Sequence, residues 1–244
     1  MNGEILLAED VPRTFAELVI EAHCASTGDG FSIALSGGST ARRCYSSLAA
    51  ATDASFWSSV ELFWGDERCV DLDHPDSNYR LAREAIGGGF DQARALHPMR
   101  CESTDSPEPR NSPDSDPAPH FGDAEQYDAL IADRSPIDVL HLGLGPDGHT
   151  ASLFPESRAL DPPPGRLVVT NRDPLGNNPH LRMTLTFEAI ATARLVLVTV
   201  EGASKQDALR RVIDGDRGTP ASRIDASRVV WIVDGAALGS SSPR

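Results

Sequence analysis

A turn rich in glycine and hydroxyl side chains, residues 35–40 (LSGGST), follows an apolar stretch typical of a strand. Gly37 and Gly38 allow a tight turn with exposed N–H groups, and Ser39 and Thr40 offer hydroxyls at the start of a helix. Backbone N–H groups at a helix N-terminus form a natural cradle for an anion. The turn is not a Walker A loop, and it fits an ordinary strand-to-helix turn with a capping serine equally well.

Three consecutive charged residues, Asp66, Glu67 and Arg68, follow the apolar run at residues 60–64. In one interpretation Asp66 and Arg68 line a sugar-phosphate pocket, where arginine suits bidentate contact with a phosphate or carboxylate. In the other, the segment is a solvated turn in which Arg68 pairs with Asp66 or Glu67, and such a pair contributes little to stability.

Residues 142–155 (LGLGPDGHTASLFP) contain a G-x-G-x-x-G spacing directly after an apolar strand. A dinucleotide site is disfavoured, because Pro146 stiffens the loop and Pro155 leaves room for only one or two helical turns. The glycine between Asp147 and His149 lets an acid and an imidazole face one cavity. A carboxylate can fix the tautomer of a histidine and stabilise its imidazolium, which suits general acid–base chemistry. A structural histidine is the alternative.

The single lysine of the chain, Lys205, stands at the start of a predicted helix in the stretch GASK, whereas all other basic residues are arginines. A compact ammonium can contact one phosphate oxygen, although chance could also leave one lysine at this position. The sequence contains neither G-x-S-x-G nor HExxH. Any hydrolysis is therefore expected to use activated water, with no metal and no covalent serine.

Apolar β-branched runs alternate with helical patterns along the chain. This alternation predicts an α/β fold with a mostly parallel sheet covered by helices on both faces. Sheets of this kind bind ligands beyond the carboxyl ends of their strands, which is where the motifs above lie. The predicted strands are residues 31–36, 60–64, 137–144, 166–170, 195–200 and 228–233, and the predicted helices are 42–51, 78–86, 186–193 and 204–213.

Composition narrows the possible partners and locations. A formal net charge of −14 over 244 residues disfavours a nucleic-acid binder. The sequence shows no basic leader before an apolar stretch and no apolar run near 18 residues, which disfavours secretion and membrane insertion. The cysteines form no CxxC pair, so we expect free thiols in a reducing compartment and a cytoplasmic protein. These cysteines are Cys24, Cys44, Cys69 and Cys101.

Residues 101–122 interrupt the pattern with five prolines and five acidic residues, and Phe121 is their only large hydrophobe. Such a segment cannot bury enough apolar area to offset the entropy of ordering. We therefore expect a mobile acidic loop within a single domain that spans residues 1–244. A linker between two domains is the alternative.

Six segments, in this order and spacing, resemble the 6-phosphogluconolactonase family, which shares a superfamily with glucosamine-6-phosphate deaminases. The resemblance implies one Rossmann-like α/β domain of the NagB/RpiA type. It also implies hydrolysis of 6-phospho-D-glucono-1,5-lactone in the oxidative pentose phosphate pathway. We expect no cofactor, and we expect the protein to be a monomer. The segments are LSGGST (35–40), FWGDER (63–68), DSNYRLAREA (76–85), LGLGPDGHTASLFP (142–155), RMTLT (182–186) and GASK (202–205).

The resemblance also implies roles for individual residues. His149 would take a proton from the attacking water, and Asp66, Arg68 and Asp147 would surround the lactone. The 6-phosphate would be held by Gly37, Gly38, Ser39 and Thr40, with positive charge from Lys205 and Arg182.

Two alternatives to the lactonase remain. The deaminase branch carries Asn-Glu-Pro after its DGH segment, where this chain has Leu153-Phe154-Pro155. That departure favours the lactonase. A sugar-phosphate sensor without catalysis is disfavoured, because the Asp147-Gly-His149 and Asp66-Glu-Arg68 sets are intact.

Overall fold

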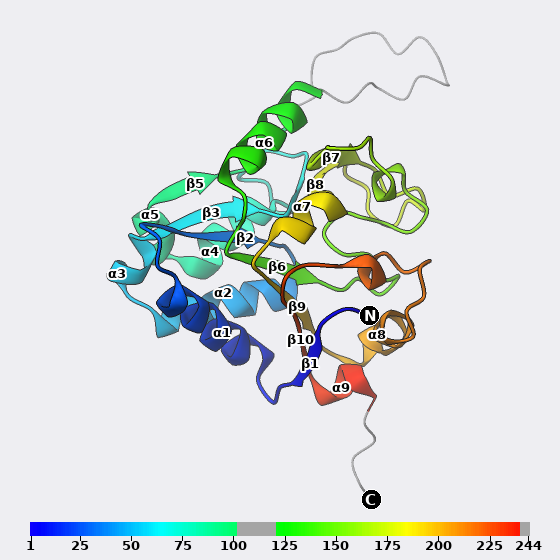
Figure 1. Ribbon diagram of the computed structural model, residues 1–244, viewed down its shortest axis with the longest axis horizontal. Coiled ribbons are helices and arrows are strands. Elements are labelled where there is room, and N and C mark those ends of the chain that lie inside the picture. Colours follow the sequence, from blue (N-terminus) through cyan, green and yellow to red (C-terminus); the bar gives the residue numbers. More distant parts are fainter. Residues whose placement is uncertain (102–120, 240–244) are drawn as a thin grey trace, which may run out of the picture.

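Seven parallel strands form a central sheet in the order β1-β10-β9-β6-β2-β3-β5 (Figure 1). The structure is a computed structural model that describes residues 1–101 and 121–239. The strands of this sheet are β1 (Glu4–Leu7), β2 (Phe31–Leu35), β3 (Val60–Trp64), β5 (Ala95–His97), β6 (Val139–Gly143), β9 (Leu195–Val200) and β10 (Val229–Val233).

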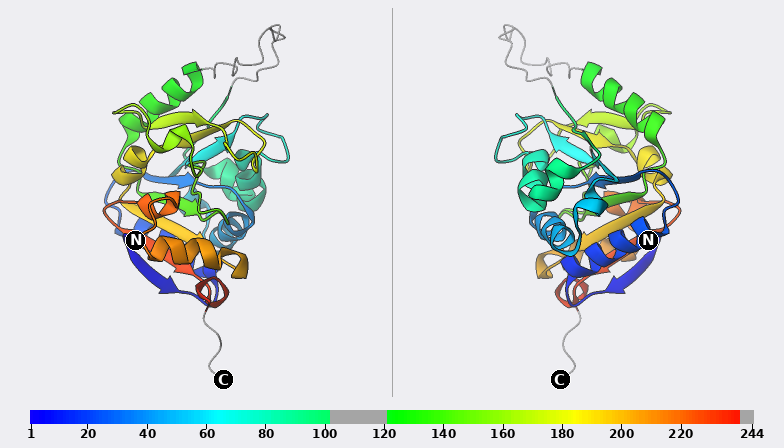
Figure 2. Two further views of the ribbon diagram at one scale, coloured as in Figure 1. Left: turned by 90° about the vertical axis from the view of Figure 1, so that its right-hand side faces the viewer. Right: turned by 90° about the vertical axis from the view of Figure 1, so that its left-hand side faces the viewer.

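Helices cover both faces of the sheet. Helices α1, α2 and α4 pack side by side. Figure 2 shows α2 and α4 on one side of the parallel strands and α6 and α7 on the other. The helices are α1 (Val11–Ala25), α2 (Ser39–Ala51), α3 (Ala54–Trp57), α4 (Asn78–Ile86), α5 (Gly88–Gln92), α6 (Phe121–Arg134), α7 (Phe187–Thr192), α8 (Gln206–Ile213) and α9 (Gly235–Leu238), with short 3₁₀ turns at Arg158–Leu160, Ala203–Lys205 and Pro220–Arg223.

The central strands are apolar on both faces because helices cover both. Every residue of β9 and β10 is buried, and the rings of Trp57, Trp64 and Trp231 are almost fully enclosed. The predicted fold class, a mostly parallel sheet with helices on both faces, is confirmed.

A second, antiparallel sheet of three strands lies beside the main one. Its strands are β4 (Asp66–Arg68), β8 (Arg182–Leu185) and β7 (Val168–Asn171), in the order β4-β8-β7. The strand predicted at residues 166–170 is thus confirmed, but it belongs to this sheet and not to the parallel one. It pairs with β8, which the sequence did not predict because four residues carry too short a pattern.

The prediction that all four cysteines are free is wrong. Cys69 and Cys101 form a disulfide with their Cα atoms 5.0 Å apart, while Cys24 and Cys44 are free. Cys69 follows β4 and Cys101 follows β5, so the fold brings together two thiols that are 32 residues apart in sequence. The pairing depends on long-range topology, which spacing alone does not reveal.

Two further expectations concern chain segments. Residues 102–120, most of the predicted mobile loop at 101–122, lie outside the described residues. Within the described ranges, no helix has the length and apolar character needed to cross a bilayer.

Candidate active site

A cavity of about 230 Å³ opens at the carboxyl ends of four adjacent central strands, β9, β6, β2 and β3. Open α/β sheets bind their ligands at this edge. Nine of the ten predicted site residues line the cavity, and the tenth, Asp147, contacts one of them. The nine are Gly37, Gly38, Ser39, Thr40, Asp66, Arg68, His149, Arg182 and Lys205.

The turn after β2 presents backbone to the cavity. Gly38 adopts a φ of 102°, in the region that favours glycine, and it forms the N-cap of α2 without a side-chain hydrogen bond. The first N–H groups of α2 therefore have no capping side chain. Such groups, at the positive end of a helix dipole, suit an anion. A Cβ on Gly37 would lie 1.9 Å from Oδ1 of Asn78, so any other residue there would displace the Asn78 amide that contacts Asp66.

Residues 66–68 form strand β4 rather than the expected turn. Successive side chains of a strand point to opposite faces, so Asp66 and Arg68 line the cavity and Glu67 points away from it. One carboxylate oxygen of Asp66 accepts a hydrogen bond from the Ser152 hydroxyl at 2.6 Å, and the other accepts one from Nδ2 of Asn78 at 3.3 Å. This carboxylate is thus held in a fixed orientation at the cavity wall.

Glu67 anchors the beginning of α4. Its carboxylate accepts hydrogen bonds from the backbone N–H groups of Asn78 and Tyr79, both at 2.7 Å, and from the Ser77 hydroxyl at 3.0 Å. Burial raises the pKa of Glu67, and these backbone hydrogen bonds offset part of the rise. The buried acid is therefore structural, and it fixes β4 relative to α4.

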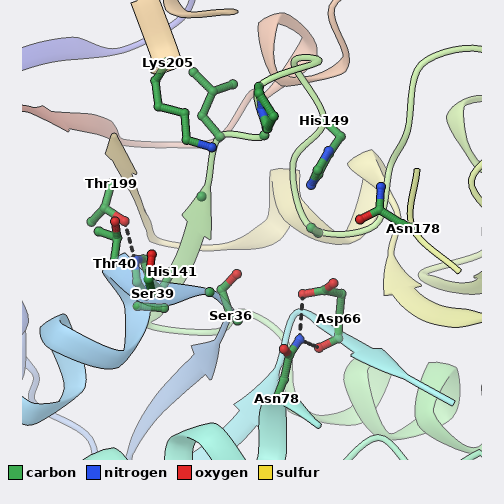
Figure 3. A pocket seen from close by; sticks show the side chains of 18 of the residues that line it. Ser36, Ser39, Thr40, Asp66, Asn78, His141, His149, Asn178, Thr199 and Lys205 are labelled. Carbon is green, nitrogen blue, oxygen red and sulfur yellow. Dashed lines mark hydrogen bonds between the residues drawn. The ribbon is translucent and has the colours of Figure 1, made fainter. Parts of the chain in front are cut away.

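The pair Asp147 and His149 lies in the loop after β6. Nδ1 of His149 is 2.6 Å from a carboxylate oxygen of Asp147. Because an ionised carboxylate can only accept, Nδ1 carries the hydrogen and Nε2 is left as a proton acceptor. Figure 3 shows the His149 ring projecting into the cavity. Burial alone would raise the pKa of Asp147, but its hydrogen bonds and the charge of His149 outweigh burial and lower it.

The glycines of this loop make room for the pair. A Cβ on Gly145 would lie 2.2 Å from Nδ1 of His149, and Gly148 adopts a φ of 93° with its Cβ position 2.4 Å from Thr219. Residues 144–157 contain no helix. A dinucleotide fingerprint needs a helix at that place, so the loop serves the Asp147–His149 pair instead.

Three cations stand around the cavity. Burial lowers the pKa of Lys205, and the Asp147 charge opposes that shift. Arg68 on β4 and Arg182 on β8 stand directly opposite each other in the antiparallel sheet. The Nε atom of each is buried without a hydrogen-bond partner. Burial lowers the pKa of Arg182, partly offset by the charge of Asp66. In Figure 3 Lys205, Ser39 and Thr40 lie on one side of the cavity, and His149 and Asp66 lie on the other.

Sequence reasoning missed several lining residues, among them Asn78, His141 and Thr199. His141 and Thr199 are polar residues inside otherwise apolar strands, β6 and β9. A buried histidine needs hydrogen-bond partners, so its place in an apolar run was a usable signal. Asn78 lies in the stretch DSNYRLAREA, and its contact with Asp66 appears only when β4 and α4 meet.

No metal-binding cluster is found in the described part of the chain. In residues 1–101 and 121–239, no group of three or more histidine, cysteine, aspartate or glutamate side chains is arranged to hold an ion.

Comparison with known proteins identifies relatives over almost the whole chain. The family profile described as glucosamine-6-phosphate isomerases/6-phosphogluconolactonase matches residues 6–231. A 6-phosphogluconolactonase from Synechocystis is 38% identical over 86% of this chain and 84% of its own length. A Trypanosoma cruzi 6-phosphogluconolactonase structure superposes with a TM-score of 0.80 and 25% identity, covering 99% of this chain and 98% of that one.

A monomeric glucosamine-6-phosphate deaminase shares the fold at 18% identity, with a TM-score of 0.75 and coverage of 99% of this chain and 100% of that one. At that identity the likeness speaks to the fold alone. The predicted resemblance to the 6-phosphogluconolactonase family is confirmed.

Proposed function

Because the chain belongs to the glucosamine-6-phosphate isomerase/6-phosphogluconolactonase family, we propose that it is an enzyme that hydrolyses 6-phospho-D-glucono-1,5-lactone to 6-phosphogluconate. The reaction is the lactone-opening step of the oxidative pentose phosphate pathway. One observation carries the proposal. The free Nε2 of His149 faces the same cavity as the uncapped N-terminus of α2 and Lys205.

The chemistry begins at His149. Nε2 takes a proton from a water molecule as that water attacks C1 of the lactone, and the Asp147 carboxylate stabilises the resulting imidazolium. The tetrahedral intermediate carries a negative charge on the former carbonyl oxygen, and Arg68 donates a hydrogen bond to it. When the ring C1–O5 bond breaks, the imidazolium returns its proton to O5. The products are the open-chain acid and the regenerated base.

The phosphate end of the substrate supplies binding energy that holds C1 near His149. The N–H groups and hydroxyls of residues 37–40 bind the phosphate oxygens, with Lys205 adding a positive charge. Arg182 supplies further charge from the opposite wall, where it lies beside Arg68. Asp66, fixed by Ser152 and Asn78, accepts a hydrogen bond from a sugar hydroxyl.

The deaminase alternative is less well supported. At the position where the deaminase branch carries a glutamate, this chain has the buried Phe154, whose ring packs edge-on against His149 with 5.0 Å between ring centroids. An apolar ring cannot relay a proton to the histidine. A δ-lactone is already activated toward water and needs no such relay.

Two assays run side by side test the function. Proton release from freshly prepared 6-phosphogluconolactone should exceed spontaneous hydrolysis, and ammonia release from glucosamine 6-phosphate should stay at background. Deamination without lactone hydrolysis would overturn the assignment. Tight binding of 6-phosphogluconate without turnover of either compound would instead favour the sensor.

The proposal extends to location and partners. It describes a cytoplasmic monomer that acts on a small-molecule sugar phosphate and needs no cofactor, nucleic acid or membrane. The net charge of −14 supports the exclusion of nucleic acids and anionic membranes. Because Cys69 and Cys101 form a disulfide, the location needs its own test by cell fractionation. Size-exclusion chromatography should show elution at the size of one chain.

A further inference from the structure

The strand β2 ends at Leu35, and the next residue, Ser36, starts the turn that the proposed function assigns to phosphate binding. Ser36 has left the parallel ladder, so its backbone needs other partners. The Tyr45 hydroxyl supplies both. It accepts a hydrogen bond from the Ser36 N–H at 2.6 Å and lies 3.0 Å from the Ser36 carbonyl oxygen, to which it donates. Tyr45 belongs to α2, so the helix that follows the turn also closes it.

His141 holds this tyrosine from the neighbouring strand. Its Nδ1 lies 2.9 Å from the Tyr45 hydroxyl, and its Nε2 lies 2.9 Å from the hydroxyl of Thr199 on β9. His141 and Tyr45 are fully buried, and Thr199 is 3% exposed. His141 and Thr199 also form part of the cavity lining, and Figure 3 shows their hydrogen bond beside Ser39 and Thr40.

One arrangement of protons satisfies the whole network. The single hydroxyl hydrogen of Tyr45 goes to the Ser36 carbonyl, and its oxygen accepts from the Ser36 N–H and from Nδ1–H of His141. Nε2 of His141 then accepts from Thr199. This arrangement needs a neutral imidazole, and burial favours that form because it lowers the pKa of His141 to about 3. Each buried donor and acceptor in the arrangement has a partner.

We propose that His141 is a positioning residue for the phosphate-binding turn, acting through Tyr45 to fix Ser36 and thereby the N–H groups of residues 37–40. The inference rests on the proposed function, since it takes these residues as the phosphate cradle. The network ties β6 and β9 to the turn after β2. Without it Ser36 would have unpaired backbone groups, and the cradle would bind phosphate only after ordering itself.

A second tyrosine provides a matched control. The Tyr127 hydroxyl accepts a hydrogen bond from the backbone N–H of Trp64 at the end of β3, at 2.9 Å, as Tyr45 does from Ser36 at the end of β2, and it lies 3.0 and 3.3 Å from the carbonyl oxygens of His97 and Trp64. Tyr127 is also buried, but it does not line the cavity. Its loss should reduce stability as the loss of Tyr45 does, without touching the phosphate turn.

The experiment compares Tyr45→Phe, His141→Leu, the double variant and Tyr127→Phe. The inhibition constant of inorganic phosphate, the KM and kcat for the lactone, and the melting temperature are measured for each. Tyr45→Phe and His141→Leu should each raise the phosphate inhibition constant about 5- to 10-fold and raise KM more than they lower kcat. The phosphate inhibition constant of the double variant should be no higher than that of the more affected single variant, because both substitutions act through the same hydroxyl. Tyr127→Phe should lower the melting temperature with the phosphate constant unchanged.

Each outcome has a distinct meaning. If the parent protein is not inhibited by phosphate, the proposed phosphate cradle itself is wrong, and the role of His141 falls with it. If the parent is inhibited but Tyr45→Phe keeps the parental constant, the positioning role is wrong and the proposed function stands. If Tyr127→Phe weakens inhibition by phosphate as much as Tyr45→Phe does, the effect is a general loss of rigidity, and the inference is overturned. Tyr45→Phe removes one oxygen only. A parental phosphate inhibition constant in this variant therefore overturns the inference even if His141→Leu fails to fold.

Discussion

Two histidines, one within β6 and one in the loop that follows it, have opposite environments. His141 is fully buried between two hydroxyl groups, and burial lowers its pKa to about 3. His149 has 23% of its side chain exposed and is paired with the carboxylate of Asp147. A histidine buried without a carboxylate is a neutral, fixed hydrogen-bonding group. A histidine at the cavity surface with a carboxylate behind it can accept a proton from water.

The largest effect is expected for His149→Ala. Loss of the general base should lower kcat by about 10²- to 10⁴-fold, while inhibition by inorganic phosphate stays near the parental value, because the phosphate site lies on the other side of the cavity. Steady-state assays with fresh lactone measure both.

His97→Ala is the matched control for that change. His97 also pairs with a carboxylate, that of Glu61 at 3.0 Å, and the two side chains have similar exposure to Asp147 and His149, but neither lines the cavity. The kcat of His97→Ala should stay within about twofold of the parental value. An unchanged kcat in His149→Ala would contradict the contrast between His149 and His141.

The pH dependence of stability should separate the parent from His141→Gln. The folded protein keeps His141 neutral down to about pH 3, whereas the unfolded chain protonates it below its ordinary pKa of 6.5. The unfolded state then binds more protons, so the parent loses up to about 1.4 kcal/mol per pH unit as the pH falls from 6.5 toward 3.

Urea denaturation at pH 7.5, 5.5 and 4.5 measures the difference. Asp147, whose folded pKa is lowered, also loses its contribution in acid, but it does so in both proteins. The difference in the free energy of unfolding between parent and variant should therefore narrow by roughly 2–3 kcal/mol from pH 7.5 to pH 4.5, through His141 alone. A constant difference would mean that His141 takes up a proton as readily in the folded protein as in the unfolded chain.

Asp147→Asn should have an intermediate effect on catalysis. The amide cannot stabilise an imidazolium as a carboxylate does, so kcat should fall about 10- to 10²-fold. Steady-state assays of parent and variant with fresh lactone measure the loss. If kcat is unchanged, Asp147 only shapes the loop.

The smallest effect is expected outside the two histidines. Lys205→Ala should raise KM and the phosphate inhibition constant about tenfold while kcat changes less than threefold, because a phosphate contact acts mainly on binding. Lys205→Arg keeps the charge and tests whether a compact ammonium is required. A kcat loss as large as that of His149→Ala would place Lys205 at the reacting atoms.

Much of the fold could be predicted because the central strands are buried on both faces. The runs at residues 60–64, 195–200 and 228–233 are almost wholly apolar, and each is a strand of the parallel sheet. Strands at the margins carry no such pattern. β1 is exposed along its length at the sheet edge, and β4 consists of three charged residues. These two segments are strands because they pair with strands that are far away in sequence, β1 with β10 and β4 with β8.

The site could be predicted where turn chemistry marks it, as in residues 35–40 and 142–155. The positions that support these motifs were beyond pattern reasoning. Asn78 and Ser152 orient Asp66 from different elements, and Tyr45 of α2 reaches back to Ser36, nine residues earlier in the chain. Their hydroxyl and amide groups resemble those of many surface residues until the fold assembles them.

The Cys69–Cys101 disulfide also closes part of the chain into a covalent ring that contains α4, α5 and β5. A protease that cuts once within this ring leaves a single covalently joined molecule, which separates into two fragments only after reduction. A cut beyond Cys101 divides the chain at once. The nicked ring would keep the strand that carries Arg68 attached to the edge of the main sheet, so backbone cleavage and loss of the substrate cavity need not coincide.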